Sequence, residues 1–382
     1  MFNQLSLAKE LSEKEIQVLI AIQEDPMATF SKLHEKTKMA KSVLHSIVKK
    51  LTEGERPYYA VVGIPNLETL QLQMFDVIIT ASEVSQVRKL YQLGYAHPYT
   101  AYLGQAFGRT NGALMQFRMP PETEPLLIEL LEKLKESKYI DDYNILPIKE
   151  SVMYTSALLD YWNQNSLSWS FDWDSLFQLD KNISKRISSS RKRKNSKKMK
   201  ESVSSFGMLQ KSDIVVITYL CQNAKIKGVE AVEELEKKGF STTTQTYSRR
   251  SKWLKKDYFI GERVFLDPNV FDLLNTVLIW GKGDKDLLEA LKINIDPKTF
   301  PFTSTFKTEN GYLFWYLHLP TTHLSKLLNH LNTIMDELNF YFIDYPNVKN
   351  YPIWHGAFDE KESSWKRDRI FLVDDPFKAL LD

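Results

Sequence analysis

The sequence of 382 residues contains a single cysteine, Cys221, which excludes an internal disulfide and any zinc site built from several cysteines. No apolar run approaches the roughly 18 residues of a transmembrane helix, and the start, Met1 to Gln4, lacks the pattern of a secretion signal. We therefore expect a cytoplasmic protein in a reducing compartment, with no membrane partner. Cys221 lies in an apolar run, where a small buried core residue is expected.

Motifs for catalysis or nucleotide binding are also scarce. None of the seven histidines pairs with another at the i,i+4 spacing of a helical metal site. The segment from Gly281 to Asp284 lacks the spacing of either nucleotide-binding motif, and we interpret it as a turn. No serine elbow and no pair of catalytic carboxylates stands out. We predict that the protein is not an enzyme and that it uses no metal or cofactor.

The net charge is only +2, but the cations are unevenly distributed. Nine cations and no acid lie between Lys185 and Lys200, a run that repels itself and cannot bury a core. Two compatible interpretations remain open, a solvated linker and a flexible arm that neutralises DNA phosphates. The candidate phosphate contacts in this run are Arg191, Lys192, Arg193 and Lys194.

The chain repeats itself with a displacement of about 200 residues. Pro98–Thr100 matches Pro301–Thr303, and Asn111-Gly112 matches Asn310-Gly311. The order of matches never breaks, so the copies differ by small insertions of the kind that fall in surface loops. The period is too long for a solenoid. It indicates duplication of a whole two-domain unit.

The first half of each unit has the pattern of three short helices. Ser12 and Glu15 form a capping box before the first helix, and Val43, Ile47 and Leu51 share one stripe of the third. The expected helices are 12–22, 30–37 and 41–51 in copy one and 213–222, 229–238 and 242–255 in copy two. Strands at 58–63 and 258–266, the latter with a turn at glycine 261, are expected to be wings.

The opposite stripe of each third helix is small, polar or cationic, and such groups can reach base edges or phosphates. Arg250 occupies the position that matches apolar Ile47, so the packing of this helix differs between the copies. The residues that we predict to contact DNA are Lys41, Ser42, His45 and Lys49 in copy one and Thr243, Thr244, Gln245, Ser248, Arg249 and Lys252 in copy two.

The second half of each unit reads as βαββαβ. Asn111-Gly112 between two strand patterns is a strong hairpin signal. The strand Tyr312–Tyr316 is apolar on both faces, which indicates that one face packs on helices and the other on a partner sheet. The expected elements are 70–80, 83–93, 99–107, 113–119, 122–138 and 139–146 in copy one and 270–280, 284–291, 300–306, 312–319, 321–338 and 340–345 in copy two.

A winged helix-turn-helix followed by a βαββαβ domain resembles the Lrp/AsnC, or feast/famine, family of transcription regulators. The residues that carry the resemblance are Ala28–Val43 with Val48–Leu51 in copy one, and Arg249–Leu254 with Phe265–Pro268 in copy two. The resemblance implies an α+β fold in which the third helix enters the major groove of double-stranded DNA, with Arg249 matching an arginine of the family. Copy one departs by having Ser46 at that place and Lys38 in a turn where the family usually has glycine.

The resemblance also implies a small effector, bound in loops of the βαββαβ domain, for which Gly104, Gly108 and Gly112 are the candidates. It implies a homodimer or higher homo-oligomer that presents two heads to successive turns of DNA. The copies could pair within one chain or between chains, and both arrangements stay open. Two further functions remain as alternatives. Some proteins built on this unit resemble tetrapyrrole (siroheme) decarboxylases, and the chain could also be a protein-interaction adaptor with vestigial heads.

Aromatic segments after each βαββαβ domain are too apolar for free linkers, so each is expected to dock on its own copy; a partner-binding strip is the alternative. The predicted domains are helix-turn-helix 1 (1–66), ferredoxin-like domain 1 (67–148), an aromatic extension on copy one (149–182), a basic linker (183–207), helix-turn-helix 2 (208–268), ferredoxin-like domain 2 (269–346) and an aromatic C-terminal extension (347–382).

Overall fold

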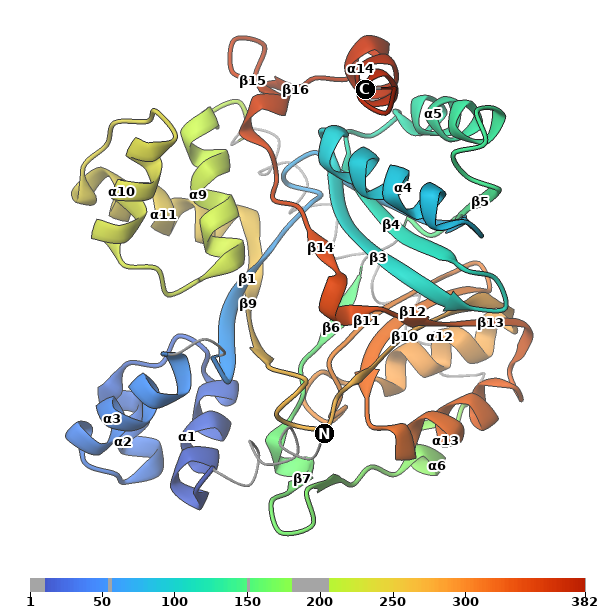
Figure 1. Ribbon diagram of the computed structural model, residues 1–382. Coiled ribbons are helices and arrows are strands. Elements are labelled where there is room, and N and C mark those ends of the chain that lie inside the picture. The colour runs from blue at the N-terminus through green and yellow to red at the C-terminus, as the bar shows by residue number, and fades with distance from the viewer. Residues whose placement is uncertain (1–10, 54–56, 150–151, 181–205, 382) are drawn as a thin grey trace.

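The computed structural model describes residues 11–53, 57–149, 152–180 and 206–381. The fold is α+β, with two helical heads on one side and two ferredoxin-like domains on the other (Figure 1). Arg191, Lys192, Arg193 and Lys194 lie outside the described residues, so their role stays a prediction. Within the described ranges, no helix is both long enough and apolar enough to cross a bilayer.

Each head contains the three expected helices. Ser12 and Glu15 form the predicted capping box, and Leu44 is buried in the third helix of copy one while Val43 is exposed. The buried stripe therefore starts one residue later than expected. The helices are α1 (Glu13–Glu24), α2 (Phe30–Thr37) and α3 (Lys41–Thr52) in head one, and α9 (Lys211–Gln222), α10 (Gly228–Lys237) and α11 (Thr244–Tyr258) in head two.

The expected wings are not hairpins. The strand after each head, β1 (Tyr59–Pro65) or β9 (Phe259–Leu266), pairs antiparallel with the other, from Tyr59 opposite Leu266 to Pro65 opposite Phe259. Gly261 lies inside β9 opposite Ile64 and makes no turn. The two strands form a ribbon between the heads, and this ribbon satisfies the backbone groups that a wing would have paired locally.

Both ferredoxin-like domains have the predicted βαββαβ order. Their elements are β2 (Gln73–Thr80), α4 (Val84–Ala96), β3 (Thr100–Gly108), β4 (Gly112–Met119), α5 (Glu124–Glu136) and β5 (Asp142–Ile145), then β10 (Asn275–Gly283), α12 (Lys285–Asn294), β11 (Ser304–Glu309), β12 (Tyr312–Leu319), α13 (Thr321–Leu331) and β13 (Met335–Ile343). The last helix ends at Leu331, earlier than the expected residue 338, and β13 begins at Met335. The hairpin at Asn111-Gly112 is present.

The two domains pair within the chain. Ten strands form one sheet, in which the edge strand β3 of copy one bonds to β13 of copy two through Ala106–Gly108 and Tyr341–Ile343. Short strands extend both junctions, β6 (Met153–Thr155) alongside β11 and β14 (Lys349–Asn350) alongside β3. Of the two arrangements left open by the sequence, this structure contains the one within a single chain.

The faces of the sheet that carry no helices pack on each other, as expected from the two-sided apolar strand Tyr312–Tyr316. Leu114 of copy one and Phe314 of copy two belong to one buried cluster between these faces. Polar groups also meet there: Lys307 on β11 forms an ion pair with Asp76 on β2 at 2.5 Å, with side-chain exposures of 3% and 0%. Gln116 donates to the other Asp76 oxygen at 2.6 Å.

The aromatic extensions dock on the opposite copies, which corrects our prediction that 149–182 packs on copy one. Trp173 donates to Nδ1 of His323 at 2.9 Å, and its ring stacks on Phe302, both in copy two. In return Trp365 donates to the Leu70 carbonyl of copy one at 2.6 Å. The cause is the pairing of β6 with β11 and of β14 with β3, which leads each chain segment across to the other copy.

Each head rests on the extension beside it. In head one, Gln23 receives a hydrogen bond at 3.1 Å from the Leu159 amide, and in head two Thr218 donates to the Ile353 carbonyl at 3.0 Å. The remaining short elements belong to these extensions. They are η3 (Leu159–Tyr161), β7 (Trp162–Asn163), β8 (Ser168–Trp169), α6 (Trp173–Leu176), η4 (Tyr345–Asn347), η5 (His355–Ala357), β15 (Phe358–Asp359), β16 (Ser364–Trp365), η6 (Ile370–Asp374) and α14 (Asp375–Lys378).

The buried ion pair between the copies generates a stability prediction. Replacing Lys307 with methionine leaves the Asp76 carboxylate buried without its cation, so we expect a loss of about 3–5 kcal/mol in the free energy of unfolding, measured by chemical denaturation. Adding Asp76→Asn should restore part of this loss. Lys135→Met, which breaks the exposed pair with Asp142, is the matched control and should leave the denaturation midpoint unchanged. A Lys307→Met variant as stable as the control would contradict the prediction.

Candidate functional site

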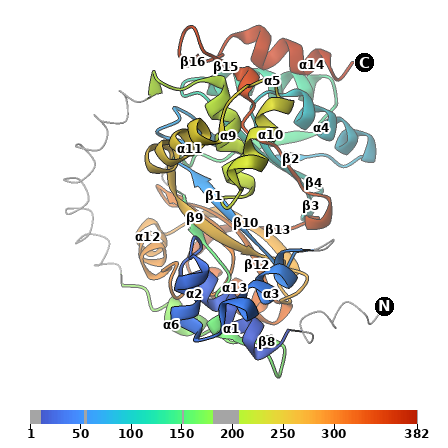
Figure 2. The ribbon, with the colours of Figure 1, turned by 90° about the vertical axis from the view of Figure 1, so that its left-hand side faces the viewer.

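The third helices of both heads lie on the same side of the molecule, α11 above and α3 below in the view of Figure 2. The β1–β9 ribbon runs between them and fixes each head relative to the sheet. Their buried residues, such as Leu44 on α3 and Leu254 on α11, face the heads' own cores. The polar stripe of each helix is therefore turned to solvent, as the sequence predicts.

Head two presents the more open surface. Gln245, Ser248, Arg249 and Lys252 are exposed, and their side chains make no hydrogen bond or ion pair within the described chain. Thr244 is exposed as well, whereas the Thr243 hydroxyl caps α11 by accepting from the Thr246 amide at 3.2 Å. Thr243 is therefore the N-cap of α11, a structural role that the sequence did not lead us to predict.

In head one the predicted residues are exposed but more often engaged. His45 stacks on Phe30 with ring centroids 3.7 Å apart, and Lys41 donates to the Ser31 hydroxyl at 3.0 Å. Lys49 lies 3.7 Å from Glu53 in an i,i+4 pair, and Ser42 is exposed. The two heads therefore offer different surfaces to a ligand.

Two departures from the family pattern have structural solutions. Lys38 adopts the left-handed conformation, with φ of 59°, at the turn after α2, where the equivalent residue of head two is Gly239 with φ of 84°. Arg250, at the position of apolar Ile47, forms an ion pair with Asp213 on α9 and lies 4.4 Å from the centre of the Trp253 ring. Each departure is thus accommodated by a conformation or contact within its own head.

The three candidate effector glycines do not form one loop. Gly104 and Gly108 lie within β3, and Gly112 begins β4. A Cβ on Gly108 would lie 2.5 Å from the Phe340 carbonyl oxygen, and one on Gly104 would lie 2.9 Å from a methyl group of Ile343. The close approach of β13 to β3 therefore explains why both positions are glycine. Effector binding by them stays a prediction, and no loop built from them supports it.

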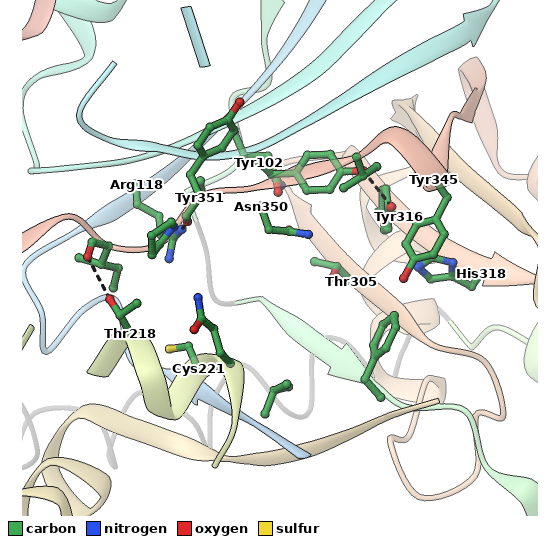
Figure 3. A pocket seen from close by; sticks show the side chains of 18 of the residues that line it. Tyr102, Arg118, Thr218, Cys221, Thr305, Tyr316, His318, Tyr345, Asn350 and Tyr351 are labelled. Atoms are coloured by element: carbon green, nitrogen blue, oxygen red, sulfur yellow. Dashed lines mark hydrogen bonds between the residues drawn. The ribbon is translucent and has the colours of Figure 1, made fainter. Parts of the chain in front are cut away.

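A cavity of about 500 Å³ lies between the sheet layers and head two (Figure 3). Its walls come from β3, β4, β11 and β12, from α9, from both strands of the ribbon and from the segment Tyr345–Ile353. Residues at equivalent positions of the two copies face each other there: Gln116 and Arg118 on β4 correspond to Tyr316 and His318 on β12. The cavity therefore lies at the axis that relates the copies.

Arg118 brings the cavity its one permanently charged side chain among the described lining residues. Its guanidinium donates to the Tyr351 carbonyl and has no carboxylate partner in the described chain. Burial lowers the pKa of Arg118, but the guanidinium remains cationic at neutral pH. Arg118 is half-buried, and a cation that is partly removed from water without an anion is unfavourable, a cost that an anionic ligand would offset.

His318 faces the cavity as a neutral imidazole. Burial, with a smaller contribution from the Arg263 cation, lowers the pKa of His318 to about 3. Its Nδ1 is 2.8 Å from the Thr276 hydroxyl, which leaves Nε2 as the ring nitrogen free for a ligand. The nearby hydroxyls of Tyr102 and Tyr316, from different copies, are 2.9 Å apart (Figure 3).

Sequence reasoning missed this cavity. Cys221 was expected in the core, but it is half-buried and lines the cavity, where burial raises the pKa of its thiol to about 12. The thiol is therefore neutral and a poor nucleophile. A usable signal was present, because Arg118 and His318 occupy the same place in the repeat and are both polar on an apolar strand.

Comparisons with known proteins give likenesses of structure. No family model and no curated protein sequence matches the chain. The siroheme decarboxylase NirDL is similar over 97% of this chain and 100% of its own, with 14% identity and a TM-score of 0.48. A transcriptional regulatory protein of the AsnC family from Pyrococcus furiosus (21% identity, TM-score 0.29) covers 37% of this chain and 92% of its own. The leucine response regulatory protein of Mycobacterium tuberculosis (17%, 0.27) covers 37% and 95%. At these identities the likeness extends to the fold alone.

The neutral state of His318 predicts a dependence of stability on pH. Below about pH 6.5 the unfolded chain protonates this histidine and the folded chain does not, so acid lowers the free energy of unfolding. His318→Gln should reduce the slope of that free energy between pH 6 and 4 by about 1.4 kcal/mol per pH unit. Urea denaturation across this range measures it. His97 is also buried, and its pKa is also lowered to about 3, so it contributes to the same pH dependence of the free energy of unfolding. The variant should therefore keep part of the slope. An unchanged slope would show that His318 is charged in the folded state.

Proposed function

We propose that the protein is a DNA-binding transcription regulator and not an enzyme, and that α11 of head two makes the base-specific contacts. The observation that carries this proposal is the unpartnered stripe of Gln245, Ser248, Arg249 and Lys252 on an exposed third helix. These side chains need not break any internal hydrogen bond or ion pair before they contact a groove. Arginine donates two bonds to guanine, and glutamine can bind adenine in the same two-point way.

The placement of the heads supports contact with one DNA duplex. Both third helices lie on the face shown in Figure 2, and one chain carries both. Heads of this type contact half-sites about 34–36 Å apart on successive turns. Head one, whose His45 and Lys49 are engaged internally, serves better for phosphate contacts, which position a protein without reading sequence. A second chain is not needed to supply the second head; a homodimer remains an expectation.

Arg249→Ala tests the proposal. Sites selected from random DNA by the wild-type protein should be bound more weakly by the variant, by about 1–3 kcal/mol, with preference lost at one base position. Footprinting and titration at two salt concentrations measure both effects. Arg109→Ala, which removes an exposed arginine from the turn between β3 and β4, is the control and should bind normally. Equal loss on every sequence would reassign Arg249 to a phosphate, and absence of DNA binding by the wild-type protein would refute the proposal.

A second candidate function is decarboxylation of a tetrapyrrole carboxylate. One observation favours it: Arg118 and His318 face the same cavity, as a carboxylate-binding cation and a proton donor would. Against it, the described lining supplies one permanent cation, whereas siroheme-type tetrapyrroles carry several carboxylates. The chemistry would also require His318 to donate a proton from a neutral ring, a weak acid.

Absorption spectroscopy distinguishes the two functions. If the cavity does not accept a tetrapyrrole, adding haem or iron uroporphyrin to the pure protein should give no shifted Soret band, and Arg118→Gln should behave like the wild-type protein. A shifted band that disappears in Arg118→Gln but persists in Arg109→Gln would favour the enzyme. Release of carbon dioxide from the bound compound would then establish the reaction.

A further inference from the structure

We infer that the cavity between the sheet layers and head two binds a small aromatic monocarboxylate, and that its occupancy changes DNA binding by head two. The first part stands on the cavity alone. The second part rests on the proposed DNA-binding function, so the two are tested separately.

The positive charge of Arg118 in the cavity favours an anionic ligand. Arg118 has five N–H donors in a planar fork, and the described chain gives this guanidinium only the Tyr351 carbonyl as a partner. Asp76, the carboxylate buried between the sheet layers, is already paired with Lys307 and bonded by Gln116. A ligand carboxylate can take two parallel bonds from the free side of the fork. Among the described lining residues, one cation lacks a carboxylate partner, which calls for one negative charge. Arg263, a second cation without a carboxylate partner in the described chain, is not among these lining residues.

The side chains that line the cavity favour a ligand with an aromatic group. Phe265, Phe314 and Tyr345 line the cavity, and Tyr345 meets the His318 ring edge to face at 4.8 Å. Such rings prefer edge-to-face or offset contact with another aromatic group. The volume of about 500 Å³ is within the ordinary range for small-molecule sites, about 300–1,000 Å³. His318 Nε2 and the Asn350 amide supply polar contacts beyond the carboxylate site.

A ligand there would touch head two directly. Thr218 and Cys221 on α9 form part of one wall (Figure 3), and Gln222 of the same helix also lines the cavity. Just beyond the end of α9, the Ala224 amide donates to the Val61 carbonyl of the ribbon at 2.8 Å, and the Ala224 carbonyl accepts from Lys255 of α11 at 2.8 Å. A shift of α9 against the sheet would therefore move α11, the helix that we propose to read DNA. The matching region of head one borders no such wall of this cavity.

Binding is tested first without DNA, on the full chain. Benzoate, phenylacetate and indole-3-acetate are titrated by calorimetry, with indole-3-acetamide as the uncharged counterpart of the last. We expect at least one acid to bind, indole-3-acetate to bind at least tenfold more tightly than its amide, and Arg118→Gln to weaken the tightest acid at least tenfold. Arg109→Gln, the matched arginine control, should bind as the wild-type protein does.

Arg118 also bonds the Tyr351 carbonyl, so its loss could disturb the fold. Thr305→Phe fills the cavity from the opposite wall without touching Arg118, and it should abolish binding while the thermal unfolding temperature is kept. The first part of the inference is overturned if none of the three acids binds the wild-type protein, if acid and amide bind equally, or if both cavity variants bind as the wild-type protein does. Binding of iron uroporphyrin in preference to all three acids would also overturn it.

Coupling is then measured with the selected DNA site. A saturating concentration of the tightest acid should change the DNA dissociation constant of the wild-type protein about fivefold or more, and should leave that of Thr305→Phe unchanged. DNA affinity unaffected by a bound acid would overturn the coupling alone. Failure of the wild-type protein to bind DNA would refute the proposed function, and the calorimetric result would still stand on its own.

Discussion

The pairing of the two copies depends on a lysine and an aspartate that are buried between the sheet layers. The Asp76 side chain is fully buried and that of Lys307 is 3% exposed, so each needs the other, and they come from different copies. Separation of the copies would therefore break this ion pair at a cost in free energy. The pair also fixes the position of β2 relative to β11. Gln116 bonds Asp76 and also lines the cavity, which links the ion pair to the candidate ligand site. A wholly apolar interlayer would tolerate sliding that this arrangement excludes.

The exchange of extensions extends this constraint to the heads. Each extension crosses to the opposite copy, covers its helix-lined core with tryptophans, and supports the adjoining head. Head one therefore shares a hydrophobic cluster with ferredoxin-like domain 2, and head two with domain 1. Because no half of the chain can close its own core, the orientation of both heads is fixed by contacts between copies. The β1–β9 ribbon adds a direct backbone link between them.

Local signals in the sequence predicted the elements well and their long-range partners badly. The capping box at Ser12 and the Asn111-Gly112 hairpin are decided within a few residues, and both are present. The strand Tyr59–Pro65 alternates in the same way whether it folds into a wing or pairs with a strand 200 residues away, so its partner could not be read from its pattern. The extensions were recognised as docked segments, but β6 pairs with copy two through only three residues, too few to leave a pattern. The exposed surface of α11 was predictable because helical spacing decides it, whereas the cavity depends on how two sheets meet.

Duplication within one chain explains the asymmetry of the cavity. In a dimer of identical chains, an arginine at the place of Arg118 would be repeated across the symmetry axis, and two cations would face one small space. Here the equivalent position carries His318, whose lowered pKa keeps it neutral, so the described lining residues bring only one permanent charge. Likewise, copy two has Tyr316 at the position that matches Gln116 of copy one, and the Tyr316 hydroxyl is hydrogen-bonded to that of Tyr102 across the axis. The heads diverge in the same way, with an open polar stripe on α11 and an internally engaged one on α3. A fused pair can thus place an unmatched cation, Arg118, in copy one and an open polar stripe, on α11, in copy two, which identical subunits cannot do.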